Sequence, residues 1–151
     1  MFEPWSVLDR APRRPGLRVA VVLDEFSLSA FGYEWDQVEV TPSTWRSLLE
    51  EQPVDLLFVE SAWHGNHDAW QFHLTGPSAP RPAFVELVQW CRAHGIPTVF
   101  WNKEDPAHYD DFLAAARLFD HVYTTDSTCI ERYEMDLGHE RVDVLPFAAQ
   151  Q

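Results

Sequence analysis

The sequence predicts an α/β protein with a mainly parallel sheet that carries helices on both faces. Apolar runs of strand length alternate along the chain with segments whose apolar residues recur at helical spacing. The run at residues 17–23 is almost free of polar side chains, as expected for a strand that is covered on both faces. Strands joined by crossover helices pair in parallel, so the alternation itself indicates the type of sheet.

Each element follows from a local pattern. Residues 19–23, 56–59 and 99–100 lack polar alternation and form the predicted buried centre of the sheet. The helix expected at 83–94 has its apolar residues on one face and is followed by Gly95, a favourable residue after a helix end. The expected order is strand 17–23, a short helix to 31, strand 38–40, a helix to about 51, strand 54–59, helix 83–94, strand 97–101, helix 106–119, strand 121–123, a helix to about 135 and strand 141–145.

A chain of 151 residues is expected to form one domain with a real core. Residues 1–16 carry several charges where a signal peptide would have an apolar core, so we interpret them as an N-terminal arm before a domain at 17–151. Cys91 and Cys129 fall on predicted helices without CxxC spacing, which favours free thiols and a cytoplasmic location.

Charge and missing motifs exclude several functions. The formal net charge of −13 argues against nucleic acid or an anionic membrane surface as a partner, and no apolar run approaches the length of a membrane span. The chain has no GxGxxG after its first strand, no GxxxxGK[ST] and no GxSxG. We therefore expect no cofactor, and a diphosphate would find few cations here.

Polar residues cluster where the predicted strands end. Lys103 is the only lysine, and it stands between an amide and two carboxylates directly after the run at 97–101. Because ligands of parallel sheets bind beyond the carboxyl ends of the strands, we expect one shared edge to gather a set of candidate residues. They are Asp24, Glu25, Glu60, Ser61, Asn102, Lys103, Glu104, Asp105 and Thr125.

Structural roles remain open for the same residues. Lys103 could belong to an ion-paired loop that fixes the next helix. Asp24, Asp105 and Asp126 each precede a predicted helix and could cap it, and capping is the favoured interpretation for Asp126.

The connection at residues 62–82 is too long for an ordinary loop, and such loops are usually functional or disordered. It contains two tryptophans and three histidines, among them the candidates Trp63 and His64, and the candidate Asn66 lies beside them. The histidine spacing fits no closed zinc site, and we expect no metal. Polar groups interleaved with flat aromatic rings suit a hydroxyl-rich ligand, while a lid without a ligand is the alternative.

Four motifs in order resemble the N-terminal domain of CgeB-like glycosyltransferases, the spore maturation protein type. They are residues 58–63 with Gly65 and Asn66, residues 101–106, residues 123–126 and residues 145–148. The resemblance covers residues 17–150 and implies a Rossmann-like domain, the N-terminal half of a GT-B fold that meets a sugar acceptor. It implies that a C-terminal domain binds the nucleotide-sugar donor, and that this chain stops where the linker to that domain begins.

On this hypothesis the enzyme transfers a sugar to an acceptor hydroxyl, and Asp105, Glu104 and His64 are the candidates that assist the hydroxyl. The candidate substrate-binding residues are Asp24, Glu25, Glu60, Ser61, Trp63, Asn66, Asn102, Lys103 and Thr125. A non-catalytic carbohydrate-binding or scaffold module is the alternative. A receiver-like signalling domain fits less well, because the sequence offers Glu60-Ser61 after the third strand and no lysine after the fifth.

Overall fold

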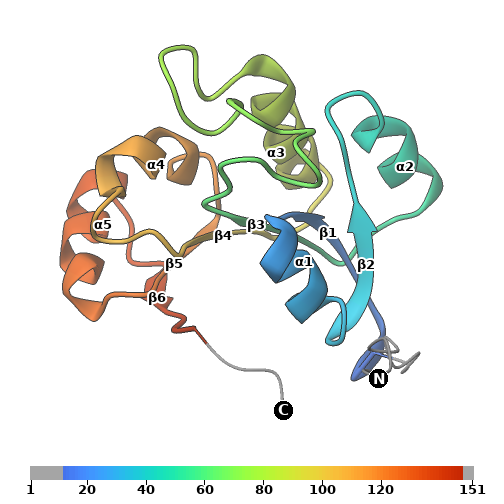
Figure 1. Ribbon diagram of the computed structural model, residues 1–151, viewed down its shortest axis with the longest axis horizontal. Coiled ribbons are helices and arrows are strands. Elements are labelled where there is room, and N and C mark those ends of the chain that lie inside the picture. Colours follow the sequence, from blue (N-terminus) through green and yellow to red (C-terminus); the bar gives the residue numbers. More distant parts are fainter. Residues whose placement is uncertain (1–11, 148–151) are drawn as a thin grey trace, which may run out of the picture.

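The computed structural model describes residues 12–147, which form a six-stranded sheet with the strand order β2-β1-β3-β4-β5-β6 (Figure 1). All neighbouring strands pair in parallel. The fold is therefore α/β and Rossmann-like, as the alternation predicts. The strands are β1 (Arg14–Val22), β2 (Trp35–Glu39), β3 (Leu56–Glu60), β4 (Thr98–Asn102), β5 (His121–Thr124) and β6 (Val142–Val144).

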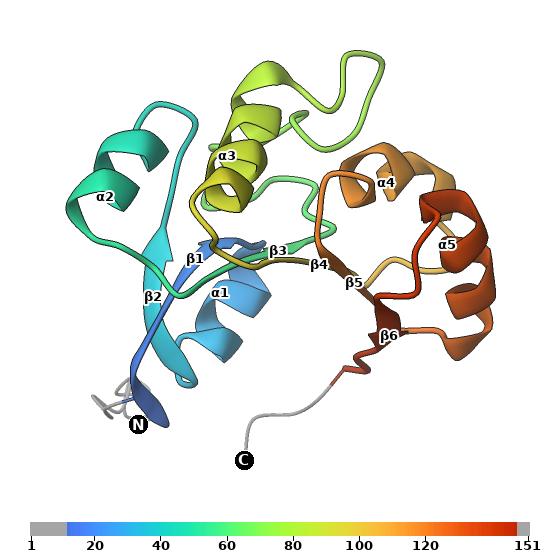
Figure 2. The ribbon, with the colours of Figure 1, turned by 180° about the vertical axis from the view of Figure 1, so that it is seen from behind.

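Helices cover both faces of the sheet, but unequally. The helices are α1 (Glu25–Phe31), α2 (Trp45–Glu51), α3 (Pro82–Ala93), α4 (Tyr109–Ala116) and α5 (Ile130–Leu137), with the 3₁₀ turn η1 (Ser127–Cys129) before α5. The chain runs outward from β1 to β2 and then crosses back to β3 and onward to β6. Right-handed crossovers in these two directions place helices on opposite faces. Figures 1 and 2 show α1 on one side of the sheet and the other helices on the far side, in agreement with the two clusters of buried side chains.

The predicted centre of the sheet is confirmed. Residues 19–23 are completely buried, and Leu57, Val59 and Phe100 are as well. The larger cluster packs α2, α3, α4 and α5 against the sheet, and the smaller one packs α1 against β1, β3 and β4. In the smaller cluster Phe31 stacks on Trp35, with ring centroids 5.2 Å apart.

Some element boundaries differ from the expected ones. β2 begins at Trp35 instead of 38, because this ring packs into the smaller cluster although polar residues follow it. β1 begins at Arg14, so residues 14–16 of the expected arm belong to the sheet, while residues 1–11 lie outside the described residues. α4 begins at Tyr109 instead of 106, after a turn at residues 103–108.

Two further features concern the described residues. Cys91 and Cys129 are buried and free, as expected. None of the helices in residues 12–147 combines the length and apolar character that crossing a membrane requires.

Candidate functional site

The strand order reverses between β1 and β3, and the carboxyl ends of β1, β3 and β4 meet at this point. In open α/β sheets, ligands bind in the crevice at such a reversal. Two adjoining cavities lie here, and His64 lines both. The first has a volume of about 520 Å³ and is lined by Asp24, Glu25, His64, Gly65, His67 and Asp68. The second has a volume of about 630 Å³ and is lined by Trp63, His64, Gln71, Phe72, Thr75, Gly76, Pro77, His108 and Asp111.

Three charged side chains join the ends of the three strands. The Lys103 Nζ atom lies 3.1 Å from Glu60 Oε1 and 3.6 Å from Asp24 Oδ2. Glu60 is completely buried and also accepts hydrogen bonds from the Asp24 N–H and the Ser27 hydroxyl, both at 2.6 Å. Burial raises the pKa of Glu60, and the Lys103 charge opposes that rise. Strand polarity alone predicts this convergence, and the ion pairs turn the three groups toward one another.

Asp24 fixes the start of the long connection between β3 and α3. Its carboxylate accepts the backbone N–H groups of Trp63 at 3.1 Å, His64 at 3.1 Å and Gly65 at 2.8 Å. It makes no capping hydrogen bond to α1, although it stands at the N-cap position. The capping alternative is therefore wrong for Asp24, because the loop supplies the N–H groups that bind this carboxylate.

The next residues form a left-handed turn. Gly65, Asn66, His67 and Asp68 have φ angles of +68°, +48°, +61° and +68°. A side chain at Gly65 has no room, because a Cβ atom would lie 2.8 Å from the Cβ of Trp70. Asn, Asp and His are the non-glycine residues that adopt this region most readily, which is why this sequence can make such a turn.

Asn66 ties the turn to the sheet. Its side-chain amide accepts the Leu23 N–H at 3.1 Å and donates to the carbonyls of Val21 and Val40, both at 2.7 Å. Only 4% of Asn66 is exposed. Its amide is thus fully used in holding the loop against the ends of β1 and β2.

This turn brings His64 and Asp68 together. The Nδ1 atom of His64 lies 2.7 Å from Asp68 Oδ1, and both side chains are more than half exposed. A carboxylate accepts a hydrogen bond from Nδ1–H, so in the neutral ring Nε2 carries the free lone pair. His64 was predicted from sequence, whereas Asp68 was missed. No local pattern reveals this pair, because the two side chains meet only through the left-handed turn at residues 65–68.

A second polar group lies farther along the sheet edge, around Asp105. Both carboxylate oxygens accept a hydrogen bond from the Tyr133 hydroxyl, at 3.0 and 2.8 Å, and Oδ2 also accepts the Thr124 hydroxyl at 2.7 Å. Burial is the main cause that raises the pKa of Asp105. Asp105 does not cap α4, which begins at Tyr109 after His108. Asp126 does cap η1, accepting the Thr128 N–H at 2.9 Å, as favoured from sequence.

The remaining predicted residues take several places around the two groups. The Ser61 hydroxyl accepts the Lys103 N–H at 3.0 Å and belongs to the first group. Asn102 accepts the Glu104 N–H and donates to the Tyr133 hydroxyl, which links it to the Asp105 group. Glu25 is exposed and lines the first cavity, while the half-buried Thr125 directly follows β5.

Trp63 and Phe72 of the long connection lie near α4, whereas Trp70 packs against Phe84 of α3. The Trp63 ring lies with its centroid 4.9 Å from those of His108 and Phe112. Phe72 is 58% exposed and lines the second cavity. Figures 1 and 2 show the connection rising beside α3 and projecting on the side of α4. Sequence reasoning missed Phe72 and His108, because the fold of an irregular loop decides their positions.

The three histidines of the connection do not converge. His64 pairs with Asp68, and His67 Nε2 lies 3.3 Å from Glu39 Oε1. His73 packs its ring against Trp70, and its Nδ1 atom is buried with no hydrogen-bond partner among the described residues. Burial lowers the pKa of His73, which disfavours its charged form.

Comparison of the chain with protein-family models, curated proteins and solved structures found no match.

Proposed function

We propose that this chain is the acceptor-side domain of a GT-B glycosyltransferase, which holds an acceptor hydroxyl while a nucleotide sugar binds to another domain. One observation carries the proposal: the His64–Asp68 pair stands between two adjoining cavities at the point where the strand order reverses. Such a crevice is the usual ligand site of an open α/β sheet.

The two cavities suit the two faces of a sugar. Trp63, Phe72 and His108 give the second cavity flat rings, on which the apolar face of a sugar would stack. In the first cavity Glu25 and Asp68 offer carboxylate oxygens that accept hydrogen bonds from hydroxyl groups, while the Asp24 carboxylate already accepts three backbone N–H groups. An acceptor that spans both cavities would pass the His64 ring.

His64 would act as the general base toward the acceptor hydroxyl. Asp68 accepts a hydrogen bond from Nδ1–H and so orients the ring, which leaves Nε2 to take the hydroxyl proton. The hydroxyl oxygen would then bond to the anomeric carbon of the donor sugar as the bond from that carbon to the nucleoside diphosphate breaks and the diphosphate leaves. The other two candidates are less suited to this step. Both oxygens of Asp105 already accept hydrogen bonds from neighbouring side chains, and Glu104 lines neither cavity.

The negative charge of the chain favours a role in binding the acceptor over a role in binding the nucleotide-sugar donor. Among the residues that the structure describes, no lysine or arginine lines either cavity, and the chain has a formal net charge of −13. A nucleoside diphosphate needs cations or free helix N-termini, so the donor is expected on another domain. Calorimetric titration of the 151-residue chain with uridine and guanosine diphosphate sugars should show no binding at up to roughly millimolar ligand. Micromolar binding would mean that the chain is the donor half.

The catalytic role is tested by transfer assays on a protein that joins this chain to its donor domain. His64→Gln should lower transfer by about 100-fold or more, the usual contribution of a general base. Asp68→Asn should lower it less, because the ring remains and only its orientation is weakened. His139→Gln, a histidine that lines neither cavity, is the matched control. Unchanged transfer in His64→Gln would overturn the assignment of the base.

A non-catalytic carbohydrate-binding module is the second candidate. It is favoured by the Asp24–Lys103–Glu60 cluster, in which Lys103 pairs with both carboxylates and Asp24 holds the loop. Sugar binding with no transfer in the joined protein would support it. The receiver-like alternative gains nothing from this geometry, because Glu60 at the end of β3 is completely buried and cannot be reached by a phosphoryl donor.

A further inference from the structure

A third cavity lies at the opposite edge of the sheet, where β3 and β4 begin. It has a volume of about 590 Å³ and is lined by Leu49, Glu50, Pro53, Val54, Asp55, Trp90, His94, Gly95 and Ile96. None of these residues lines the two cavities at the carboxyl edge. Its volume falls in the range that binds small organic molecules. This cavity is therefore separate from the candidate acceptor site.

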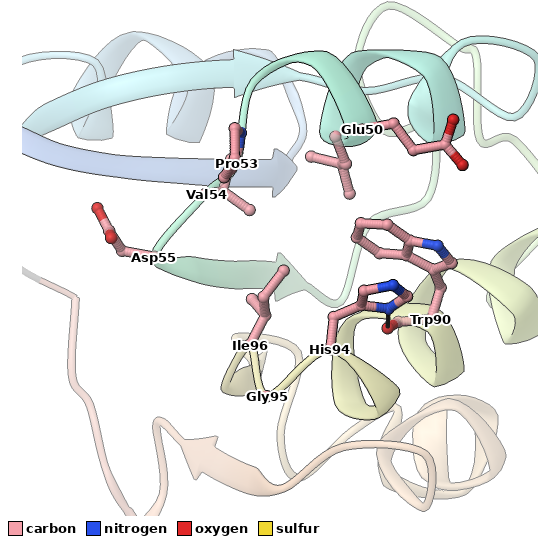
Figure 3. Close-up of a pocket in the computed structure, with 9 residues that line it drawn as sticks. Glu50, Pro53, Val54, Asp55, Trp90, His94, Gly95 and Ile96 are labelled. Carbon is pink, nitrogen blue, oxygen red and sulfur yellow. Dashed lines mark hydrogen bonds between the residues drawn. The ribbon is translucent and has the colours of Figure 1, made fainter.

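The walls of the cavity come from the ends of α2 and α3. On α3 the Trp90 and His94 rings stack with centroids 3.9 Å apart, and Trp90 also meets Trp45 of α2 edge to face at 6.0 Å. Figure 3 shows both stacked rings facing α2, with Ile96 and Val54 beside them. These contacts hold an apolar surface open between the two helices.

The formally charged groups of the lining are both acidic. Figure 3 shows Glu50 and Asp55 at opposite ends of the cavity. Glu50 meets Arg46 only at 3.7 Å on an exposed surface, and Asp55 uses Oδ2 to accept the Arg18 N–H at 2.9 Å. Within residues 12–147, no lysine or arginine lines the cavity. Both rims thus carry negative charge that a bound cation would offset.

His94 adds a hydrogen-bond acceptor to the cavity. The Nδ1 atom of His94 lies 2.7 Å from the Trp90 carbonyl oxygen. A carbonyl only accepts, so Nδ1 carries the proton, and Nε2 of the neutral ring is an acceptor as well. Among the lining side chains, only the Trp90 indole N–H is left as a donor. The polar groups therefore select for a ligand that donates hydrogen bonds.

We propose that this cavity binds a small organic cation with an apolar body, of the arylalkylamine class. The apolar body would lie on the Trp90, Val54 and Ile96 surface. The ammonium group would donate to a rim carboxylate, Glu50 or Asp55. The inference does not depend on the proposed function, since the two sites share no residue.

The test is a titration of the 151-residue chain followed by proton–nitrogen correlation spectra. Phenethylamine should shift the resonances of Trp90, His94 and Ile96, with a dissociation constant about tenfold below that of phenethyl alcohol. Methylamine, a cation without an apolar body, and 3-phenylpropionate, an apolar anion, should produce no shifts there. Equal affinity for the amine and the alcohol, no shifts at up to roughly 10 mM phenethylamine, or shifts confined to the carboxyl edge would overturn the proposal.

Substitution of the two acidic lining residues tests whether their charges attract the bound amine. Glu50→Gln and Asp55→Asn should each weaken phenethylamine binding by about two- to fivefold, the effect of an exposed charge pair, and asparagine keeps an oxygen for the Arg18 N–H. Glu51→Gln removes the same charge from the next residue of α2, which does not line the cavity, and should leave binding unchanged. If Glu51→Gln weakens binding as much as Glu50→Gln does, the attraction is to the net charge of the protein and the proposed site is wrong.

Discussion

Replacing Lys103 with methionine should lower the free energy of unfolding by about 3 kcal/mol at neutral pH. The substitution leaves the completely buried Glu60 carboxylate without its cation, and Lys103 itself is only 14% exposed. Removing one partner of a buried pair costs about 3–5 kcal/mol. We expect the lower end, because Glu60 keeps two hydrogen bonds, from the Asp24 N–H and the Ser27 hydroxyl.

The loss of stability in Lys103→Met should be smaller in mild acid. Burial raises the pKa of Glu60 above its ordinary value, so the folded protein binds this proton more tightly than the unfolded chain does. Glu60 therefore contributes stability that is fully present below its unfolded pKa and is lost as the pH rises through its folded pKa. Without Lys103 the folded pKa rises further, so Lys103→Met should cost more at pH 7.5 than at pH 5.

Urea unfolding followed by tryptophan fluorescence measures this effect, provided that the m value stays constant. The double variant Lys103→Met/Glu60→Gln removes both charges and should recover most of the loss. Arg46→Met breaks an exposed pair with Glu50 and should cost less than about 1 kcal/mol. A loss in Lys103→Met no larger than in Arg46→Met, or a double variant as unstable as Lys103→Met alone, would show that Lys103 does not stabilise the buried Glu60 carboxylate.

Three further substitutions test the loop and the second polar group by the same unfolding measurement. Gly65→Ala should lower the free energy of unfolding by about 2–4 kcal/mol, because Gly65 has a positive φ and an added Cβ would meet Trp70. Gly76→Ala, whose Cβ would enter open space, should lower it by only about 1–2 kcal/mol. Equal losses in the two variants would contradict the close packing at Gly65. Asn66→Ala should lower the free energy of unfolding by about 3–5 kcal/mol, because it removes three hydrogen bonds of a buried amide. A loss below about 1 kcal/mol would show that the loop does not depend on the Asn66 amide. Asp105→Asn should flatten the pH dependence of stability, because the raised pKa of Asp105 makes its contribution fall as the pH rises through that pKa; an unchanged pH profile would contradict this.

The fold and the meeting of strand ends follow from the sequence for simple reasons. Apolar runs without alternation identify β1, β3 and β4, and strand polarity then brings Asp24, Glu60 and Lys103 to one edge. The partners that these groups choose depend on tertiary contacts that no local pattern encodes. Asp24 looks like a helix cap in the sequence, yet it binds three N–H groups of a loop some 40 residues away.

Loop geometry explains the residues that sequence reasoning missed. Asp68 meets His64 only because residues 65–68 adopt a left-handed turn, and three of these four residues are not glycine. The cavity where β3 and β4 begin depends on the contact between Trp90 of α3 and Trp45 of α2, which helical periodicity does not reveal. Irregular segments carry no periodic pattern, so their contacts come from the structure alone.

Binding of a hydroxyl-rich acceptor in the cavities around His64 is measured by titrating the 151-residue chain with simple hexoses, N-acetylhexosamines and their short oligomers, following proton–nitrogen correlation spectra. We expect shifts confined to Trp63, His64, Asp68 and Phe72 and their neighbours, and we expect Phe72→Ala to abolish them. Shifts that map elsewhere, or no shifts at up to about 100 mM sugar, well beyond usual millimolar affinities, would contradict this expectation.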